Sequence, residues 1–294
     1  MRAKQQPGQE FATSACNNLG VAIEVAFSED PEWVLAEAEV FLASEPVLHN
    51  LILVLLGERL AYPEPGRYWL AKDGETVVGV VFQSPLEFAA TLTPMAPEAV
   101  AGMVDAIVRK GVALPGVIGE AATAARFAGQ WTERHGSAAF PVEGQRIYEL
   151  ARVPEKDEVC GRLRKASLRD RDLVVAWMRG FYADAGQGVG GFEPLVERRL
   201  AAGLFWLWED GEPTSMVANS MPVEGVVRMR AVYTPPDRRN RGYAGACVGD
   251  LSRRMRDEGH RCMLYTDLGN PTSNSLYRRI GYNAVAEALR YRFE

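Results

Sequence analysis

Residues 226–246 read VVRMRAVYTPPDRRNRGYAGA, and this stretch decides the fold that we expect. Val226 to Tyr233 is rich in β-branched residues, and the two prolines after Thr234 end the strand, because proline cannot donate a ladder hydrogen bond. A turn with three arginines and Gly242 follows, and an amphipathic helix then begins. This arrangement presents free backbone N–H groups and cationic side chains to a phosphate group. The alternative is a solvated basic turn before an ordinary helix.

A second stretch strengthens the phosphate-binding interpretation. Residues 264–282 read LYTDLGNPTSNSLYRRIGY, which predicts a strand, an Asn-Pro turn and a helix that carries Tyr277. Together the two stretches resemble the GNAT superfamily of N-acetyltransferases. Arg239 to Ala244 match the family pattern Gln/Arg-x-x-Gly-x-Gly/Ala, and Asn270 to Tyr282 match Asn-x6-Tyr-x3-Gly-Phe/Tyr. Both motifs lie in the family's order.

The resemblance implies acetyl-CoA as cosubstrate and no metal. Backbone groups near Val232 and Thr234 would contact the pantetheine arm, the turn would bind the pyrophosphate, and Asn270 would contact the cofactor from the second motif. Tyr277 would protonate the leaving thiolate; the alternative for Tyr277 is a packed helical tyrosine. The full set of implied cofactor residues is Val232, Tyr233, Thr234, Arg239, Asn240, Arg241, Gly242, Tyr243, Ala244 and Asn270.

The implied mechanism is direct attack of an amine on the thioester, so no cysteine nucleophile is required, and we interpret Cys247 as a small buried residue. Members of the family often carry a glutamate base on the long strand, but here that face offers Val226, Arg228 and Arg230. The possible bases are Glu224 and Asp267, for each of which a solvated or hydrogen-bonding acid is the alternative. The base stays unassigned.

The remainder of the chain predicts an α+β protein of two similar units, each a mostly antiparallel mixed sheet flanked by helices. A tight hairpin is expected at Asp73-Gly74, and a similar one recurs at Asp210-Gly211. We expect a polar extension over 1–20, a degenerate structural GNAT-like unit over 21–153, a linker over 154–160 and a catalytic unit over 161–294. The expected strands are 21–27, 67–72, 76–83, 117–119, a pair within 138–153, 162–166, 204–208, 215–221, 226–233, 262–266 and terminal strands, and the expected helices are 31–44, 49–60, 97–110, 121–135, 168–183, 193–202, 242–258 and 273–279.

The first unit lacks the features of the second at the corresponding positions. Its turn, Pro94 to Ala101, has no arginine and no paired glycine, and it carries an acid where phosphate would lie, so we expect no CoA binding there. In the second unit, the segment from Gly180 to Phe192 contains a cluster of four glycines, which suits either a mobile lid over the acceptor or a plain flexible loop; they are Gly186, Gly188, Gly190 and Gly191.

Composition excludes several classes of function. A net charge of −5 and a pI near 5.5 give no general attraction to nucleic acid or to anionic membranes. The longest apolar run, Leu51 to Leu56, is too short to cross a bilayer, and the first 20 residues do not resemble a secretory signal. Four scattered cysteines predict free thiols in a reducing compartment and no zinc site, hence a cytoplasmic location. A monomer with an internal pseudo-dimer, or a homodimer, is expected.

The leading hypothesis is an acetyl-CoA-dependent N-acetyltransferase that acts on a small-molecule amine or an amino-terminal group. A non-catalytic acyl-CoA-binding regulatory module is a second hypothesis, because no base is assigned and the first unit is degenerate. Transfer to a protein lysine or to aminoacyl groups is a third.

Overall fold

The computed structural model describes residues 23–155, 158–186 and 191–294. Four expectations therefore fall wholly or partly outside the described residues. They concern the 1–20 extension, the first two residues of the 21–27 strand, residues 156–157 of the linker, and residues 187–190 of the glycine-rich segment.

The elements follow one another in the same order in both halves of the chain. The first half consists of β1 (Ile23–Ser28), α1 (Pro31–Ser44), α2 (Asn50–Ala61), β2 (Arg67–Asp73), β3 (Thr76–Gln83), β4 (Ala90–Leu92), α3 (Pro97–Arg109), β5 (Gly116–Glu120), α4 (Ala121–His135) and β6 (Ala139–Leu150). The second half consists of β7 (Arg162–Lys165), the short 3-10 turn η1 (Leu168–Asp170), α5 (Arg171–Asp184), α6 (Glu193–Ala201), β8 (Phe205–Asp210), β9 (Glu212–Asn219), β10 (Val226–Tyr233), the 3-10 turn η2 (Pro236–Arg238), α7 (Tyr243–Asp257), β11 (Arg261–Asp267), α8 (Pro271–Arg279) and β12 (Tyr282–Phe293).

The sequence-based element assignments need three corrections. The strand pair expected within 138–153 is the single strand β6, and the terminal strands are the single strand β12. Glu143-Gly144 resembles a turn, but Gly144 lies within β6 where a Cβ atom would come within 2.8 Å of Leu268, so the glycine permits close packing instead. The three-residue strand β4 was not predicted, because it is too short to show a period.

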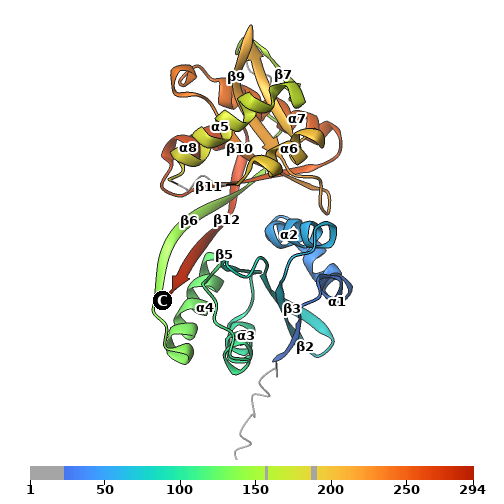
Figure 1. Cartoon of the computed structure of the whole chain (residues 1–294), viewed down its shortest axis with the longest axis vertical. Helices are drawn as coiled ribbons and strands as arrows, with labels where there is room; N and C mark the ends of the chain where they lie inside the picture. The colour runs from blue at the N-terminus through green and yellow to red at the C-terminus, as the bar shows by residue number, and fades with distance from the viewer. Residues whose placement is uncertain (1–22, 156–157, 187–190) are drawn as a thin grey trace, which may run out of the picture.

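The twelve strands form one sheet in the order β1-β2-β3-β4-β5-β12-β6-β11-β10-β9-β8-β7. Neighbouring strands are antiparallel, except that β4 pairs with β5 and β10 pairs with β11 in parallel. Strands β1 to β5 and β7 to β11 thus repeat one pairing scheme, and Figure 1 shows the two halves as separate lobes.

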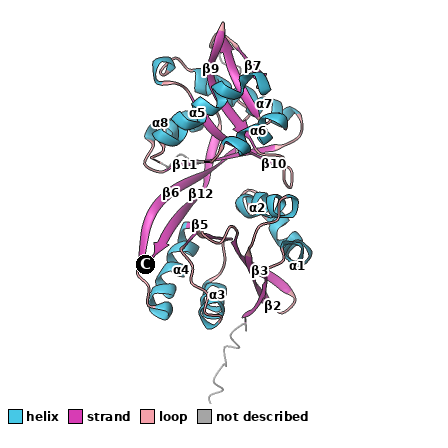
Figure 2. Cartoon of the chain, in the orientation of Figure 1, coloured by secondary structure: helices cyan, strands magenta, loops and turns pink. Residues whose placement is uncertain are grey.

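The last strand of each half lies next to the fifth strand of the other half. Strand β12 pairs with β5, and β6 pairs with β11. The two exchanged strands also pair with each other from Tyr282↔Leu150 to Phe293↔Ala139. Figure 2 shows them running side by side from one lobe to the other, so that the sheet is continuous between the lobes.

Alternate residues of the strands supply a core on each face of each lobe, as the two-residue period of a strand requires. In the first lobe Tyr68 and Leu70 pack against α1 and α2, whereas Trp69 packs against α3 and α4. In the second lobe Leu207 packs against α5 and α6, and Trp206 packs on the α7 and α8 side. A smaller cluster lies between the lobes and consists of Val47, Ile147, Val226, Met263 and Ala288.

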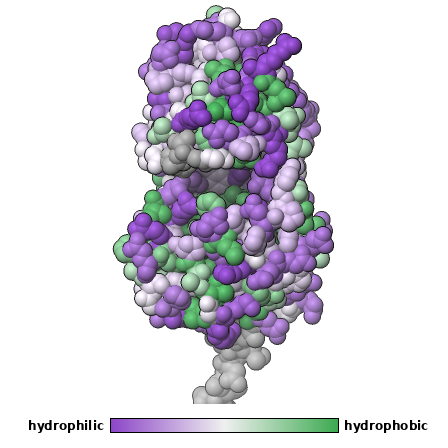
Figure 3. All heavy atoms as spheres, viewed as in Figure 1, coloured by the Kyte–Doolittle hydropathy of each residue, from purple (hydrophilic) through white to green (hydrophobic). Residues whose placement is uncertain are grey.

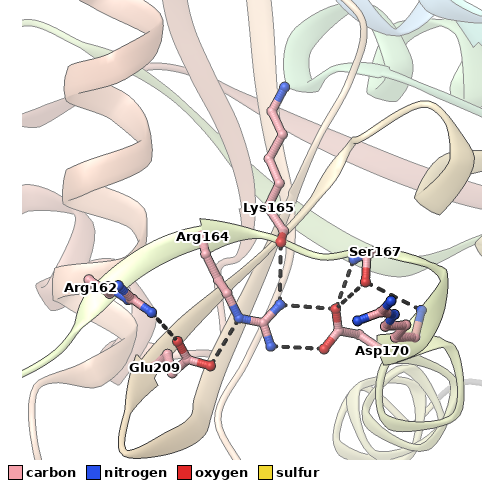
Figure 4. A network of polar contacts seen from close by, with 7 residues as sticks. Arg162, Arg164, Lys165, Ser167, Asp170 and Glu209 are labelled. Atoms are coloured by element: carbon pink, nitrogen blue, oxygen red, sulfur yellow. Dashed lines mark hydrogen bonds and ion pairs between the residues drawn. The ribbon is translucent and has the colours of Figure 1, made fainter.

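An ion-pair network fastens the start of α5 to the sheet (Figure 4). The guanidinium group of Arg164 on β7 donates to both carboxylate oxygens of Asp170, at 2.8 and 2.9 Å, and to Glu209 on β8 at 3.0 Å. Asp170 also accepts the backbone N–H of Ser167 at 2.8 Å. These bonds, Arg164 first, lower the pKa of Asp170 to about 2. The network therefore fixes where α5 begins relative to β7 and β8.

Candidate active site

The parallel strands β10 and β11 separate part-way along their length. Their pairing runs from Val226↔Arg261 to Met229↔Leu264 and ends there. Beyond that point β10 continues along β9 with a bulge between Arg230 and Tyr233, while β11 continues along β6. The facing edges of residues 230–233 and 265–267 make no ladder bonds with each other. An extended ligand inserted here would find unpaired backbone donors and acceptors, as in strand addition.

The bulge determines which side chains face each side of this opening. Ala231 has a left-handed φ of 48°, as an inserted bulge residue can. Val232 packs with the α7 and α8 core, whereas Tyr233 packs on α5. A Cβ atom at Gly180 of α5 would lie 2.3 Å from the Tyr233 hydroxyl, so that glycine makes room for the ring. Tyr233 therefore presents its backbone, not its side chain, to the opening.

The predicted phosphate turn lies directly after β10, at the start of α7. Asn240 and Gly242 have left-handed φ angles of 61° and 83°, and Gly242 is the N-cap of α7 without a side-chain cap. Within the described chain, no hydrogen bond is made by the backbone N–H groups of residues 240–245. These six consecutive donors lie at the positive end of the helix dipole and are free to bind an anion, and the binding of a phosphate there stays a prediction.

Two of the three arginine side chains of this turn already pair with acids, which differs from the expectation that all three offer free donors to a phosphate. Arg238 pairs with Glu212 and Asp237. Arg239 donates to Asp184 at 2.5 Å and to the carbonyl of Thr234 at 2.9 Å. Arg241 makes one hydrogen bond, to the carbonyl of Asp237 at 3.3 Å, and has no acidic partner among the described residues. The free donors of the turn are therefore its backbone N–H groups and the Arg241 side chain.

Tyr277 lies on α8, with its ring buried between two other tyrosines. Its ring centroid is 6.3 Å from that of Tyr148 and 6.2 Å from that of Tyr282. It shares a core cluster with Met229 and Leu264, the last paired residues before the opening. Burial raises the pKa of the Tyr277 hydroxyl above its ordinary value of 10. The hydroxyl makes no hydrogen bond to any described residue, so it is a protonated and unpartnered donor.

Two asparagines organise the turn before α8. Asn270 is the N-cap, and its side-chain oxygen accepts the N–H of Ser273 at 3.0 Å. Asn274 was not singled out in the sequence, yet its amide donates to the carbonyls of Asp267 and Asn270 and accepts the Tyr148 hydroxyl at 3.0 Å. The Asn270 side-chain oxygen is thus used in capping, and its contact with a cofactor stays a prediction.

The two acids considered as bases lie in different places. Glu224 is exposed in the turn between β9 and β10, six residues before Arg230, which corresponds to about 20 Å along an extended strand. Asp267 ends β11, and its carboxylate accepts the N–H of Gly269 at 2.7 Å. The structure therefore places Glu224 away from the opening and Asp267 at its edge with a turn-forming contact, and the base stays unassigned.

Cys247 is fully buried in α7, and burial raises the pKa of its thiol well above the ordinary range. That environment suits a packing residue rather than a nucleophile. Among the residues described, no group of three or more His, Cys, Asp or Glu side chains is placed to hold a metal ion. None of the helices in the described ranges has both the length and the apolarity to span a membrane.

The corresponding region of the first lobe is closed. Strand β4 pairs with β5 at two positions only, and the next residue, Leu92, packs so tightly on Gly119 that an added Cβ would lie 2.8 Å from its side chain. The N–H of Met95, in the turn before α3, donates to the Thr123 hydroxyl. At the start of α4, the Glu120 carboxylate accepts two backbone N–H groups. In the first lobe, side chains of the protein thus bond backbone N–H groups near the starts of α3 and α4, whereas the N–H groups of residues 240–245 in the second lobe have no such partner within the described ranges.

A cluster of three arginines lies on the other face of β10 from Tyr277, and sequence reasoning did not recognise it as a site. Arg228 and Arg230 alternate on β10, and Arg199 joins them from α6. Only Arg228 and Arg230 could be placed on one face from the sequence, because the approach of α6 depends on tertiary packing. Figure 3 shows a hollow between the two lobes with a largely hydrophilic floor.

Comparisons with known proteins agree with this geometry. A family model described as FR47-like protein matches residues 207–291, from β8 to β12. An acetyltransferase of the GNAT family from Colwellia psychrerythraea is 10% identical, with a TM-score of 0.58 over 92% of this chain and 100% of that one. A GCN5-related N-acetyltransferase from Sphaerobacter thermophilus is 15% identical, with a TM-score of 0.62 over 91% and 95% of the two chains. The chain has the GNAT acetyltransferase fold.

The likeness extends over both lobes of the GNAT-fold chain. A Drosophila protein of known structure is 14% identical, with a TM-score of 0.62 over 94% of this chain and 99% of the other. A comparison with curated proteins found no match. The family-model match contains the β10–β11 opening, the turn before α7 and Tyr277, which places the GNAT-like features in the second lobe.

Proposed function

We propose that the chain is an N-acetyltransferase that transfers an acetyl group from acetyl-CoA to a primary amine of a small molecule. The observation that carries this proposal is the convergence of three features on one opening in the sheet. These features are the unpaired edge of β10, the unbonded N–H groups of residues 240–245 and the unpartnered hydroxyl of Tyr277. They suit a thioester, a pyrophosphate and a leaving thiolate respectively.

In this proposal the backbone near Val232 and Thr234 binds the pantetheine arm in the manner of an added strand. The N–H groups of residues 240–245 bind the pyrophosphate at the positive end of α7. Arg239 would exchange Asp184 for a phosphate, since that ion pair is exposed and easily broken. An N–H group on the free edge of β10 would polarise the thioester carbonyl.

The transfer itself balances without a covalent enzyme intermediate. The neutral amine attacks the carbonyl carbon, a C–N bond forms, and the C–S bond breaks. Tyr277 gives its proton to the departing thiolate and regains one from solvent. The amine also loses one proton, for which Asp267, at the end of β11 beside the opening, is the nearer of the two candidate acids.

We further propose that the first lobe is a degenerate copy of the second with a structural role, in a cytoplasmic and monomeric protein. The repeated order of elements and the repeated pairing scheme support a duplication. The closed region at Leu92 and Gly119 supports the absence of CoA from that lobe. The exchange of β6 and β12 within one chain supports an internal pseudo-dimer.

Replacement of Tyr277 by phenylalanine tests this function. CoA affinity, measured by calorimetry, should not change, and turnover of an amine panel, measured by thiol release, should fall about 100-fold. Tyr282→Phe is the matched control, because Tyr282 is buried in the same cluster but its hydroxyl is bonded to Ser252 at 2.7 Å. Its turnover should stay near that of the wild type.

Two results would contradict the proposal. Equal turnover of the Tyr277→Phe and wild-type proteins from neutral to alkaline pH would show that Tyr277 is not the general acid. CoA binding without turnover of any amine would favour an acyl-CoA-binding regulatory module instead.

A further inference from the structure

Three arginines gather in the space between the lobes with little acid near them. Arg228 and Arg230 lie on the face of β10 that looks away from Tyr277, and Arg199 reaches them from α6. Glu58 of α2, in the first lobe, pairs with Arg199 at 3.5 Å, which is long for an ion pair. Among the described residues near this cluster, Glu58 is the acid that offsets the three positive charges.

The environment of these arginines is unfavourable for the protein alone. The Nε atom of Arg228 is buried and has no hydrogen-bond partner in the described chain. Its guanidinium lies 5.7 Å from the ring centroid of Tyr265, a contact that supplies modest compensation. Burial, and then the charges of Arg228 and Arg199, lower the pKa of Arg230. Removing three cations from water with a single acid to offset them costs free energy that hydrophobic residues would not cost.

A ligand with negative charge would resolve this cost. Guanidinium groups bind carboxylates and phosphates through paired N–H donors, and the buried Nε of Arg228 is a donor that such a group would satisfy. The position is also close to the chemistry, because Arg230 is the first residue of β10 beyond its last pair with β11. An anion held there lies on the opposite side of the sheet from Tyr277 and next to the opening.

We propose that Arg199, Arg228 and Arg230 bind an anionic group of the acceptor, so that the substrate is a small amine that also carries a carboxylate or a phosphate. This inference rests on the acetyltransferase function proposed above and names its substrate class. The amine would enter the opening from the face of α5 and α6, while the cofactor occupies the face of α7 and α8. Glu58, which pairs with Arg199, also lines a cavity of about 370 Å³ in the first lobe.

Matched acceptors test the proposal with the wild-type protein. Amino acids are compared with their carboxamides, and phosphoethanolamine with ethanolamine, by the rate of CoA release at fixed pH. The anionic member of a pair should have a kcat/KM at least about tenfold higher, as expected for a charge-assisted contact. The two pairs distinguish a carboxylate from a phosphate. The carboxamides have the more acidic amines, so intrinsic reactivity favours the neutral acceptor and works against the expected result.

Substitutions of the arginines test whether these side chains cause the preference for anionic acceptors. Arg228→Gln and Arg230→Gln should raise KM for the anionic acceptor by about tenfold or more, with a smaller change in kcat and in the neutral acceptor's KM. Arg228→Lys and Arg230→Lys, which keep the charge, should recover part of the affinity. Arg126→Gln is the control, because Arg126 is exposed on α4 in the first lobe. The unfolding midpoints of the Gln variants without ligand should not fall, since each removes one of three repelling charges; a structural role would lower them.

A second readout separates this inference from the acetyltransferase function. Calorimetry with CoA-bound protein measures the binding of the same amino acids and of phosphoethanolamine without any turnover. Anion binding that the Gln variants abolish supports the site even if no amine is acetylated. The absence of acetylation would refute only the proposed acetyltransferase function. Equal kcat/KM for anionic and neutral acceptors, or anion binding that survives in both Gln variants, would overturn the proposal.

Discussion

Replacing Asp170 with asparagine is expected to destabilise the second lobe by about 2 kcal/mol at neutral pH. The Asp170 carboxylate is 13% exposed and binds the guanidinium of Arg164 through both oxygens. These bonds lower its pKa from 3.8 to about 2, and a tenfold change in proton affinity corresponds to about 1.4 kcal/mol. The carboxylate contributes this stability above a pH of about 3.8, and the contribution is lost as the pH falls through about 2. Asparagine has no charge to contribute at any pH.

The measurement is urea unfolding at pH 7, with Asp172→Asn as the matched control. Asp172 lies two residues further along and binds Arg171 at 2.9 Å, but its side chain is 95% exposed. An exposed pair of this kind contributes little, so the control should unfold like the wild type. Equal unfolding free energies for the Asp170 and Asp172 variants would refute the argument that burial and two-oxygen contact give the Arg164 pair its strength.

Three substitutions in the second lobe and one pH profile give further expected results. Gly242→Ala should cost about 1 kcal/mol of stability and also weaken CoA binding, because its φ of 83° is left-handed and a Cβ would lie 2.8 Å from Val159. Gly259→Ala, with a φ of 88° and open space, should lose similar stability and keep CoA affinity in the same calorimetric assay. Cys247→Ala should retain turnover, and its loss in a folded variant would indicate a covalent intermediate. The pH–rate profile should rise as the amine deprotonates and show no decline near pH 10, because burial keeps Tyr277 protonated beyond that value; a decline there would indicate an ordinary tyrosine pKa.

The elements with strong local signals could be predicted from the sequence. The Asp-Gly hairpins join β2 to β3 and β8 to β9, and the predicted helices over 31–44 and 121–135 have the bounds of α1 and α4. The strand, turn and helix around Gly242 were also predictable, because proline and glycine determine the local backbone there. These features depend on neighbouring residues in the chain, so their signals survive without tertiary context.

The features that depend on distant residues were not predictable. The order of strands β12 and β6 in the sheet follows from long-range pairing, and nothing within β6 indicates which half it joins. The ion pair of Arg239 with Asp184 joins residues 55 positions apart. Arg199 reaches Arg228 and Arg230 only because α6 packs beside β10, so the cluster has no signature in the local sequence.

The exchange of β6 and β12 joins the two lobes through strand pairing. Each lobe is completed by a strand that the other half of the chain supplies, so no cut through the connection after Leu150 would release a lobe with its own full set of strands. The first lobe, although closed where the second is open, is therefore required for the second half of the chain to fold completely. Its β5 is the neighbour that holds β12, which follows directly on the helix of Tyr277, and its α2 brings Glu58 to the arginine cluster. The first half of the chain is therefore needed to complete the sheet of the second, whether or not it binds a ligand of its own.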